Sequence, residues 1–375
     1  MASVNKVLIV GGGIGGLALS IGLRKAGIDV EVVEIRQQWA IYHVGIIAQS
    51  NLVRAMVALG VADDCVAAGF PYSGVRFCDA TGRVLSQTPG VKLAGPGYPA
   101  YLGLTRPALH NVLFAASQRA GAAVRLGLAV AELAQSDTKA AVKFTDGSAD
   151  EYDLVVGADG VHSQIRTTVF GAHLKPRFTG ESVWRYNVSR PPDVDYGSIY
   201  ASIDGPKAGL IPLTRDAAYI FCIGPEPGNP RFPKEQLAKI MRERLTPFGG
   251  AIGDLAREIT NPGLVVYRPL ESVFVPSPWH RGRVVLIGDA AHAITPHLGQ
   301  GAAQAVEDAV VLADELHKNV PVQDALACFE RRRYERCKLI LEASLEIGEQ
   351  EMHPDPVRDL GLLMAKVGET VVQPI

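Results

Sequence analysis

KVLIVGGGIGGLALSIGLRKAGIDVEVVE, residues 6–34, decides the fold of this 375-residue chain. The segment begins with an apolar, β-branched run at 6–10, which is typical of a buried parallel strand. Glycines follow at once, helical spacing covers 17–26, Gly27 ends the helix, and 29–34 is a second strand. The pattern predicts a βαβ unit and therefore an α/β fold built on a parallel sheet.

The glycines between the first strand and the helix have separate expected roles. Gly11 permits a tight turn, Gly13 lets the backbone approach a pyrophosphate, and Gly16 lets the helix lie close to the strand. The first helical residues, Ile14 and Gly15, present free N–H groups and the positive end of the helix dipole to a phosphate. This segment predicts a bound dinucleotide, and by itself it does not separate FAD from NAD.

Two side chains after the second strand are candidates for the adenosine half of such a ligand. Glu34 lies 23 positions after Gly11, where a carboxylate can accept two hydrogen bonds from a ribose diol. Arg36 is either a further contact to the adenosine half or a solvated surface residue, and the sequence does not choose between them.

Two later segments place an acidic residue directly after a buried strand. DLVVGADGVHSQIR (153–166) puts Asp159 and Gly160 at the end of the strand 151–158, and GDAAHAITPHLGQGAAQAVED (288–308) puts Gly288 and Asp289 after the strand 283–287. Ligands of open α/β sheets bind at such carboxyl ends. Asp289 suits a polyol, because a carboxylate only accepts hydrogen bonds and hydroxyl groups donate them. For Asp159 the alternative is an acidic helix cap without a ligand.

Together, in this order, the three segments resemble the flavoprotein aromatic hydroxylases, the single-component (class A) FAD monooxygenases that include para-hydroxybenzoate and salicylate hydroxylases. The resemblance covers nearly all of residues 4–345. It implies FAD as cofactor, NADH or NADPH as a transient co-substrate, and O2. The implied reaction, of the EC 1.14.13 type, hydroxylates a small phenolic or heteroaromatic substrate through a flavin C4a-hydroperoxide.

The resemblance also assigns expected cofactor contacts. Asp289 would contact the ribityl chain, and Arg106 would lie close to the FAD. The helix that opens at 299–303 would direct the N–H groups of Gly299, Gly301 and Ala302 at the flavin ring edge and stabilise the anionic reduced flavin. The departure from the family pattern is Ala303, where many members carry Asn.

The predicted architecture is a discontinuous Rossmann-like FAD-binding domain, with a three-layer parallel sheet, and a smaller domain with a mostly antiparallel sheet. The FAD-binding domain is expected at 1–72, 98–175 and 266–345, the substrate-binding sheet at 73–97 and 176–265, and a helical tail at 346–375. Within the second domain, strands are expected at 182–188, 198–203, 209–213 and 217–223, with a covering helix at 234–245.

Aromatic and basic residues of this sheet are candidates to contact the substrate, and core packing is the alternative for each. Strand alternation sends Arg185 to the opposite face from Trp184 and Tyr186. The candidates are Arg185, Tyr186, Tyr200, Tyr219 and Phe221.

The loop before the last glycine pair supplies the candidates for catalysis. Pro296 and His297 are expected to border the substrate, with His297 as a proton-transfer group or as a loop histidine without a catalytic task. His292 is expected to have a structural role in packing. No metal ion is expected.

Bulk properties exclude several other classes of protein. Hydrophobic residues make up 47% of the chain and the net charge is −2, which argues against a nucleic-acid partner and against disorder. The five cysteines include no CxxC pair, so free thiols in a reducing, cytoplasmic protein are expected. We expect no membrane segment, a monomer or homodimer, and a solvated face for the arginine-rich helix 329–349. A flavin-dependent oxidoreductase, a halogenase and a non-catalytic flavin-binding protein stay open as alternatives.

Overall fold

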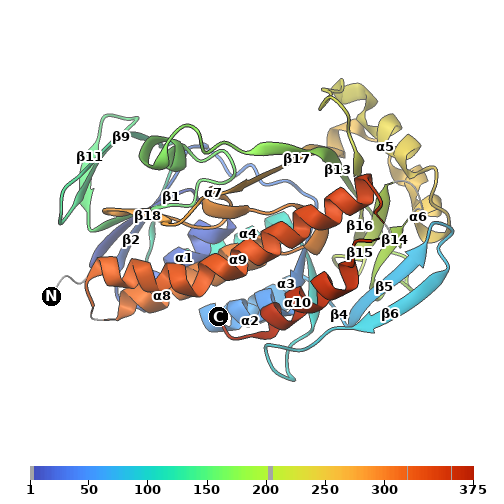
Figure 1. Cartoon of the computed structure of the whole chain (residues 1–375), viewed down its shortest axis with the longest axis horizontal. Helices are drawn as coiled ribbons and strands as arrows, with labels where there is room; N and C mark the ends of the chain where they lie inside the picture. Colours follow the sequence, from blue (N-terminus) through green and yellow to red (C-terminus); the bar gives the residue numbers. More distant parts are fainter. Residues whose placement is uncertain (1–3, 202–205, 319, 356) are drawn as a thin grey trace.

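The first βαβ unit forms as the sequence predicts. In the computed structural model, which describes residues 4–201, 206–318, 320–355 and 357–375, β1 (Lys6–Val10) pairs in parallel with β2 (Asp29–Glu34), and α1 (Ile14–Lys25) connects them (Figure 1). Gly11 has a φ of +112°, and a Cβ there would lie 2.4 Å from the carbonyl oxygen of Ala158. A Cβ on Gly16 would lie 2.0 Å from the carbonyl oxygen of Gly11. Only glycine fits either position. The predicted tight turn at Gly11 and the predicted close packing of α1 on β1 at Gly16 are both present.

This unit forms the centre of a six-stranded sheet with the order β18-β19-β12-β1-β2-β8. All its strands are parallel except β18, which pairs antiparallel with β19 at the edge. The residues of β12 and β19 are buried without exception, as expected for strands covered on both faces. The additional strands are β8 (Ala123–Leu126), β12 (Leu154–Gly157), β18 (His280–Arg281) and β19 (Val284–Leu286).

Helices and a small antiparallel sheet complete the core around the parallel sheet. α1 packs against α8 and α4, and α9 and α2 pack against α8 (Figure 1). The small sheet, with the order β11-β10-β9, contributes Ala140, Val142 and Phe144 to the same hydrophobic core. These elements are α2 (Ser50–Leu59), α3 (Ala62–Ala68), α4 (Arg106–Arg119), α8 (Gly301–His317), α9 (Val322–Met352), β9 (Val130–Gln135), β10 (Ala140–Phe144) and β11 (Ala149–Tyr152).

The second large sheet has seven strands in the order β17-β13-β16-β15-β14-β5-β6, and its pairs are antiparallel except β14 with β5. β5 and β6 form a hairpin, with Gly82 at its turn at a φ of +92°. The predicted strand 198–203 begins as β14, and residues 202 and 203 lie outside the described ranges. The strands are β5 (Gly74–Asp79), β6 (Val84–Pro89), β13 (Arg177–Ser189), β14 (Gly197–Ala201), β15 (Lys207–Pro212), β16 (Ala217–Pro225) and β17 (Val266–Phe274).

The placement of β17 differs from the expectation for residues 266 onward. The sequence predicts that they belong to the FAD-binding domain, whereas β17 pairs with β13 at the edge of the seven-stranded sheet. A further small sheet with the order β3-β7-β4 and the remaining helices complete the fold. They are β3 (Gly45–Gln49), β4 (Phe70–Tyr72), β7 (Tyr101–Thr105), α5 (Leu237–Leu245), α6 (Gly250–Leu255), α7 (Asp289–His292), α10 (Leu360–Val372), and the short helical turns η1 (Arg166–Phe170), η2 (Lys234–Gln236), η3 (Ala256–Glu258), η4 (Pro262–Leu264) and η5 (Pro296–Leu298).

The prediction that the arginine-rich helix has a solvated face is wrong for two of its arginines. Arg333 and Arg336 on α9 are buried, and both bind the carboxylate of Glu307 on α8. The charges lie inside because they compensate acidic residues that α8 turns inward.

All five cysteines are free, and four of them are buried. None of the helices in the described ranges combines the length and the hydropathy that a bilayer crossing needs.

Candidate functional site

A cavity of about 460 Å³ lies where the carboxyl ends of the parallel strands, the start of α8 and one face of the seven-stranded sheet meet. Residues from all three glycine-rich or acidic segments line it, together with residues of β13 and β16. The structure therefore brings together residues as far apart in the chain as Gly13 and Ala305. The predicted residues that line the cavity are Gly13, Ile14, Gly15, Arg106, Gly160, Arg185, Tyr219, Phe221, Gly288, Asp289, Pro296, Gly299, Gly301 and Ala302.

Backbone groups dominate one end of the cavity. Gly13 and Gly160 both line it, and a Cβ added to either would meet no atom within 4 Å. The N-terminus of α1 opens beside them, with its first N–H groups free of intrahelical partners. This end offers open space and hydrogen-bond donors, which is the arrangement that a phosphate needs.

Glu34 lies beside the glycine loop, and neither it nor Arg36 lines the cavity. The Glu34 carboxylate accepts hydrogen bonds from the backbone N–H groups of Gly12, at 3.0 Å, and Arg36, at 3.1 Å. These bonds hold the acid at the end of β2, where the sequence placed it. Its contact with a ribose and the role of Arg36 stay predictions.

Asp159 acts as a helix cap in this structure. Its carboxylate accepts hydrogen bonds from the hydroxyl of Ser163 and, at 2.7 and 3.1 Å, from the N–H groups of Gln164 and Ile165. Burial raises the pKa of Asp159, and these hydrogen bonds oppose the shift. The side chain thus points into its own turn, and Gly160 is the residue of the pair that reaches the cavity.

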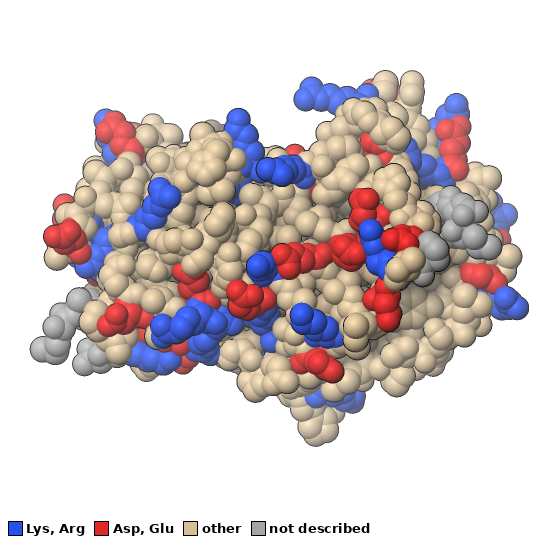
Figure 2. All heavy atoms as spheres, viewed as in Figure 1, with Lys and Arg blue, Asp and Glu red and all other residues tan. Residues whose placement is uncertain are grey.

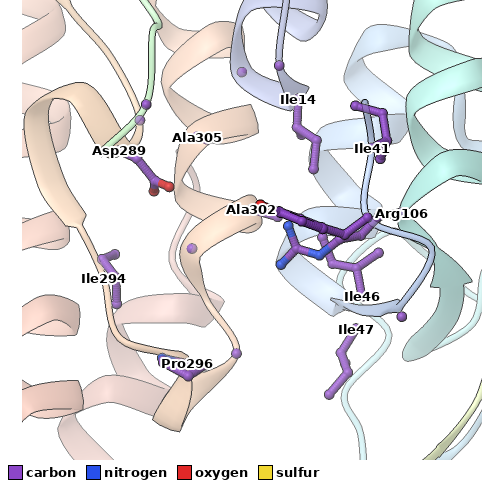
Figure 3. Close-up of a pocket in the computed structure, with 18 of the residues that line it drawn as sticks. Ile14, Ile41, Ile46, Ile47, Arg106, Asp289, Ile294, Pro296, Ala302 and Ala305 are labelled. Atoms are coloured by element: carbon purple, nitrogen blue, oxygen red, sulfur yellow. The ribbon is translucent and has the colours of Figure 1, made fainter. Parts of the chain in front are cut away.

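Asp289 and Arg106 place opposite charges at the cavity wall (Figure 3). Burial raises the pKa of Asp289, while His292 and Arg106 lower it. Burial lowers the pKa of Arg106, and its buried Nε has no hydrogen-bond partner among the described residues. Figure 3 shows the Asp289 carboxylate directed into the cavity, which Arg106 and Ala302 at the start of α8 also line.

A buried ionic network fixes the loop that carries Asp289. Asp308 on α8 accepts hydrogen bonds from the N–H of Gly288 at 2.8 Å and from Nε of Arg333 at 2.7 Å. His292 Nε2 lies 2.6 Å from the same carboxylate, so His292 has the structural role that the sequence predicted. Although burial opposes its charge, neighbouring acidic groups hold the pKa of His292 well above its usual value. The sequence gives no direct sign of this network.

The seven-stranded sheet presents one basic and two aromatic predicted residues to the cavity. Arg185 on β13 is opposite Phe221 on β16, and Asn187 is opposite Tyr219. Tyr186 does not line the cavity, because strand alternation turns it to the other face of the sheet. There it packs with Trp184 against the cluster that includes residues of α5 and α6.

Tyr200 also lies away from the cavity, in that same cluster. Its ring approaches Gly82 in the turn of the hairpin β5–β6. The expectation that Tyr186 and Tyr200 share a pocket with Arg185 therefore differs from the structure, which places them in the packed core of the opposite face.

His297 differs from its expected place in the same way. Pro296 lines the cavity, but the His297 side chain points away from it and lies 3.0 Å from Glu181. The two neighbours in η5 face opposite sides of the loop. A direct proton transfer from His297 to a substrate in this cavity is inconsistent with that direction.

Sequence reasoning missed several residues of the cavity wall. His110 lies four residues after Arg106 on α4, and its Nε2 is 3.1 Å from the carbonyl oxygen of Gly12. The i, i+4 spacing from Arg106 could have indicated it. Gly45, Ile46 and Ile47 also line the cavity, and they lie in the stretch 44–59, which resembles the Gly-Ile segment of the flavoprotein hydroxylases. Further lining residues, which carry no comparable signal, include Ala40, Ile41 and Tyr42.

This fold and cavity define a flavoprotein: the family described as "FAD binding domain" matches residues 5–344, and the chain belongs to it. It is 33% identical over 348 residues to the 2-heptyl-3-hydroxy-4(1H)-quinolone synthase of Pseudomonas aeruginosa, covering 91% of this chain and 88% of the relative. It is 32% identical over 352 residues to the aurachin C monooxygenase/isomerase of Stigmatella aurantiaca, covering 92% and 88%. The structure of Klebsiella pneumoniae HpxO with FAD and uric acid superposes with a TM-score of 0.85 at 25% identity, covering 98% and 93%. The expected family and fold class are confirmed.

Replacing Asp289 with Ala tests its assigned contact with the cofactor. We expect the affinity for FAD to fall about 10-fold, because a charged hydrogen-bond acceptor contributes about 1.5 kcal/mol or more. The measurement is the flavin released on denaturation per protein chain, and the dissociation constant from fluorescence titration. Asp289→Asn, which keeps one acceptor oxygen, should lose less. Full flavin retention in the Ala variant would refute the ribityl contact.

Proposed function

We propose that this protein is an FAD-dependent monooxygenase that uses NADH or NADPH and O2 to hydroxylate a small aromatic substrate. The observation that carries the proposal is the single cavity that joins the phosphate-type glycine loop to an aromatic wall with an unpaired arginine. The relatives named as monooxygenases, and the solved neighbour with FAD and uric acid, support the same reaction class.

The residues of the cavity fit FAD. Gly13 and Gly160 leave open space where phosphates would lie, and the buried Nε of Arg106 lacks a partner that a bound polar group could supply. Asp289 offers an acceptor for ribityl hydroxyls. Bound there, FAD would supply the redox chemistry, taking a hydride from NADH or NADPH and delivering one oxygen atom of O2 to the substrate.

The chain's own groups would bind, orient and shield these reactants. The N-terminus of α8, at Gly301 and Ala302, directs free N–H groups toward the cavity, where they would stabilise negative charge. The apolar walls from Ile46, Ile47 and Ile294 would exclude water (Figure 3). Because the chain has only one glycine fingerprint, we propose that NADH or NADPH binds transiently.

The wall of the cavity also suggests the charge of the substrate. Arg185 lines the cavity and, within the described ranges, its side chain makes neither a hydrogen bond nor an ion pair. Burial and the neighbouring Arg106 lower the pKa of Arg185 to about 10. Arg185 is half-buried, and an unpaired charge with reduced access to water is unfavourable unless a ligand compensates it. We therefore propose an aromatic substrate with an acidic hydroxyl or carboxylate group, next to Tyr219 and Phe221.

A substrate screen tests the proposed reaction. Purified protein with FAD would be mixed with NADH or NADPH, O2 and a panel of hydroxyquinolones, phenolic acids, purines and neutral phenols. We expect an acidic aromatic compound to stimulate oxidation of the nicotinamide and to yield a hydroxylated product by mass spectrometry. Oxidation that no aromatic compound stimulates, with H2O2 as the sole product, would refute the monooxygenase proposal.

Replacing Arg185 with Met tests the charge of the substrate. We expect KM for the acidic substrate to rise about 10- to 100-fold, since a hydrogen bond to a charged group contributes about 1.5–3 kcal/mol. A neutral analogue should bind almost as well as before, and Arg185→Lys should recover part of the loss. The Met variant should unfold at the same or a higher temperature, because Arg185 has no partner to lose. Equal losses for acidic and neutral compounds would contradict the proposal.

A further inference from the structure

A second cavity, of about 570 Å³, lies on the far side of the loop that carries Pro296. Two side chains that line it, with a third next to them, form a cluster from distant elements. They are Glu181 on β13, His297 on η5 and Glu351 near the end of α9. None of the three has a role in the proposed oxidation.

Two of these side chains are buried and unsatisfied. Glu181 and the His297 side chain are each 1% exposed. Both carboxylate oxygens of Glu181 and the Nε2 atom of His297 lack a hydrogen-bond partner among the described residues. Nε2 nevertheless lies 3.0 Å from Glu181 Oε2. A buried carboxylate without partners is costly, so a ligand that accepts its lone pairs would stabilise the site.

The ring of His297 is oriented so that its Nε2 atom can bind a metal ion. Its Nδ1 lies 3.0 Å from the hydroxyl oxygen of Thr295. A proton on Nδ1 that is donated to this hydroxyl leaves the lone pair of Nε2 directed at Glu181. Metal-binding histidines are held by the same kind of second hydrogen bond.

The distances suit a small cation. Nε2 of His297 is 3.0 Å from Glu181 Oε2 and 3.7 Å from Glu351 Oε2, and the three ligand atoms all lie within 4.8 Å of one another. Zinc bonds to nitrogen and carboxylate oxygen are about 2.0–2.2 Å long, which puts tetrahedral ligands about 3.3–3.5 Å apart. A single ion can therefore contact all three with small side-chain movements.

Gly348 on α9 provides the space for this cluster. A Cβ at this position would lie 2.6 Å from Glu181 Oε2 and 3.0 Å from His297 Nε2. Glycine inside a helix costs about 1 kcal/mol relative to Ala, so the close approach has a measurable cost in helix stability.

The charges around the cluster leave it net negative. Lys207 Nζ binds the other carboxylate oxygen of Glu351 at 2.6 Å, and this leaves the charge of Glu181 uncompensated when His297 is neutral. Glu342, Glu346 and Glu349 line the same cavity, although Glu346 pairs with Arg358 at 2.9 Å, and Figure 2 shows acidic side chains gathered along α9. This field attracts a cation.

The other cluster of possible ligands in the described chain, His292, Asp308 and Cys337, has a different explanation. Asp308 already accepts hydrogen bonds from Gly288 and Arg333, and it pairs with His292. The Asp308 carboxylate therefore has hydrogen-bond partners, whereas the Glu181 carboxylate has none among the described residues.

We propose that Glu181, His297 and Glu351 bind one divalent transition-metal ion of the Zn²⁺ type, with solvent as a further ligand. A nitrogen ligand with two carboxylates favours Zn²⁺ over Ca²⁺ and Mg²⁺, which prefer oxygen ligands alone. The ion ties together β13, the loop before Gly299 and the end of α9. It thereby fixes, from behind, the loop whose Pro296 lines the cofactor cavity.

Zinc binding to the full-length, FAD-loaded protein without a histidine tag tests this site. The protein is dialysed against EDTA, freed of EDTA and titrated with ZnCl2 by calorimetry. We expect one equivalent of Zn²⁺ per chain. Glu181→Gln and His297→Asn should each weaken binding about 10-fold or more, because each removes a ligand. MgCl2 should not compete.

The control is Glu342→Gln, which removes a negative charge from the same cavity without removing a ligand. It should change the affinity less than about threefold, because its charge is exposed to solvent. X-ray absorption at the zinc edge should show nitrogen and oxygen ligands near 2.0 Å and no sulfur near 2.3 Å. The proposal is wrong if no stoichiometric zinc binds, if the Gln and Asn variants bind zinc as the wild type does, or if a sulfur ligand identifies the Cys337 cluster instead.

Discussion

Replacing Arg333 with Met is expected to lower the free energy of unfolding by about 3–5 kcal/mol, the usual cost of removing one partner from a buried ion pair. Arg333 and its two acidic partners are completely buried. Its guanidinium donates to Glu307 and Asp308 at 2.7 Å each, and to the side-chain oxygen of Gln304 at 2.6 Å. The Met side chain has a comparable length and restores none of these bonds.

The reason for the large effect is the charge that remains. Burial alone would lower the pKa of Arg333, but the neighbouring Cys337, Glu307 and Asp308 outweigh it and hold this pKa above its ordinary value. Without Arg333, Asp308 keeps His292 as a partner and Glu307 keeps Arg336, so two acids share less positive charge in a medium of low polarity.

Urea denaturation followed by far-ultraviolet circular dichroism measures this loss. The matched control is Arg331→Met on the same helix, where the side chain is exposed and a change within about 0.5 kcal/mol is expected. Because Asp308 holds the N–H of Gly288, the Arg333 variant should also bind FAD more weakly than the control. Equal stability of the two variants would mean that the buried network contributes no net stability.

The first βαβ unit could be predicted in detail because its physical requirements are local. Strand, turn and helix follow one another within 29 residues, and Gly11 and Gly16 are the positions where a side chain would collide with backbone. The acidic residues after β12 and β19 were also predictable, since the carboxyl ends of parallel strands share one edge of the sheet. That rule predicts the positions of Asp159 and Asp289. It does not predict the orientation of the Asp159 carboxylate, which is set by hydrogen bonds to residues 163–165.

The substrate wall could be predicted only in part. Alternation alone separates Arg185 from Tyr186, but it does not say which face of β13 covers the cavity. That choice depends on α5 and α6, which cover the face with Tyr186 and Tyr200, and their packing involves contacts far apart in the chain. The burial of Arg333 and Arg336 on α9 could not be predicted for the same reason. Their acidic partners lie on α8, and a run of like charges in the sequence does not indicate which residues will pair with it.

Replacing Gly13 with Val is expected to weaken FAD binding by about 100-fold, equivalent to about 2.7 kcal/mol, while the protein without FAD keeps its stability. A Cβ on Gly13 meets no protein atom within 4 Å, so the chain itself accommodates the larger residue. The Val side chain would instead enter the cavity at the N-terminus of α1, where the cofactor phosphates would approach. The effect should therefore fall on the ligand rather than on the fold.

The comparison that isolates this effect is Gly97→Val. Gly97 is exposed, a Cβ there also meets no atom within 4 Å, and it does not line the cavity. Both variants should unfold, without FAD, within about 1 kcal/mol of the wild type, with a small cost at Gly13 because it caps α1. Only Gly13→Val should be purified without yellow colour and show weak binding when FAD is titrated. A yellow Gly13→Val protein with normal FAD affinity would place the phosphates elsewhere, and an unfolded one would show that the open space at Gly13 serves the fold.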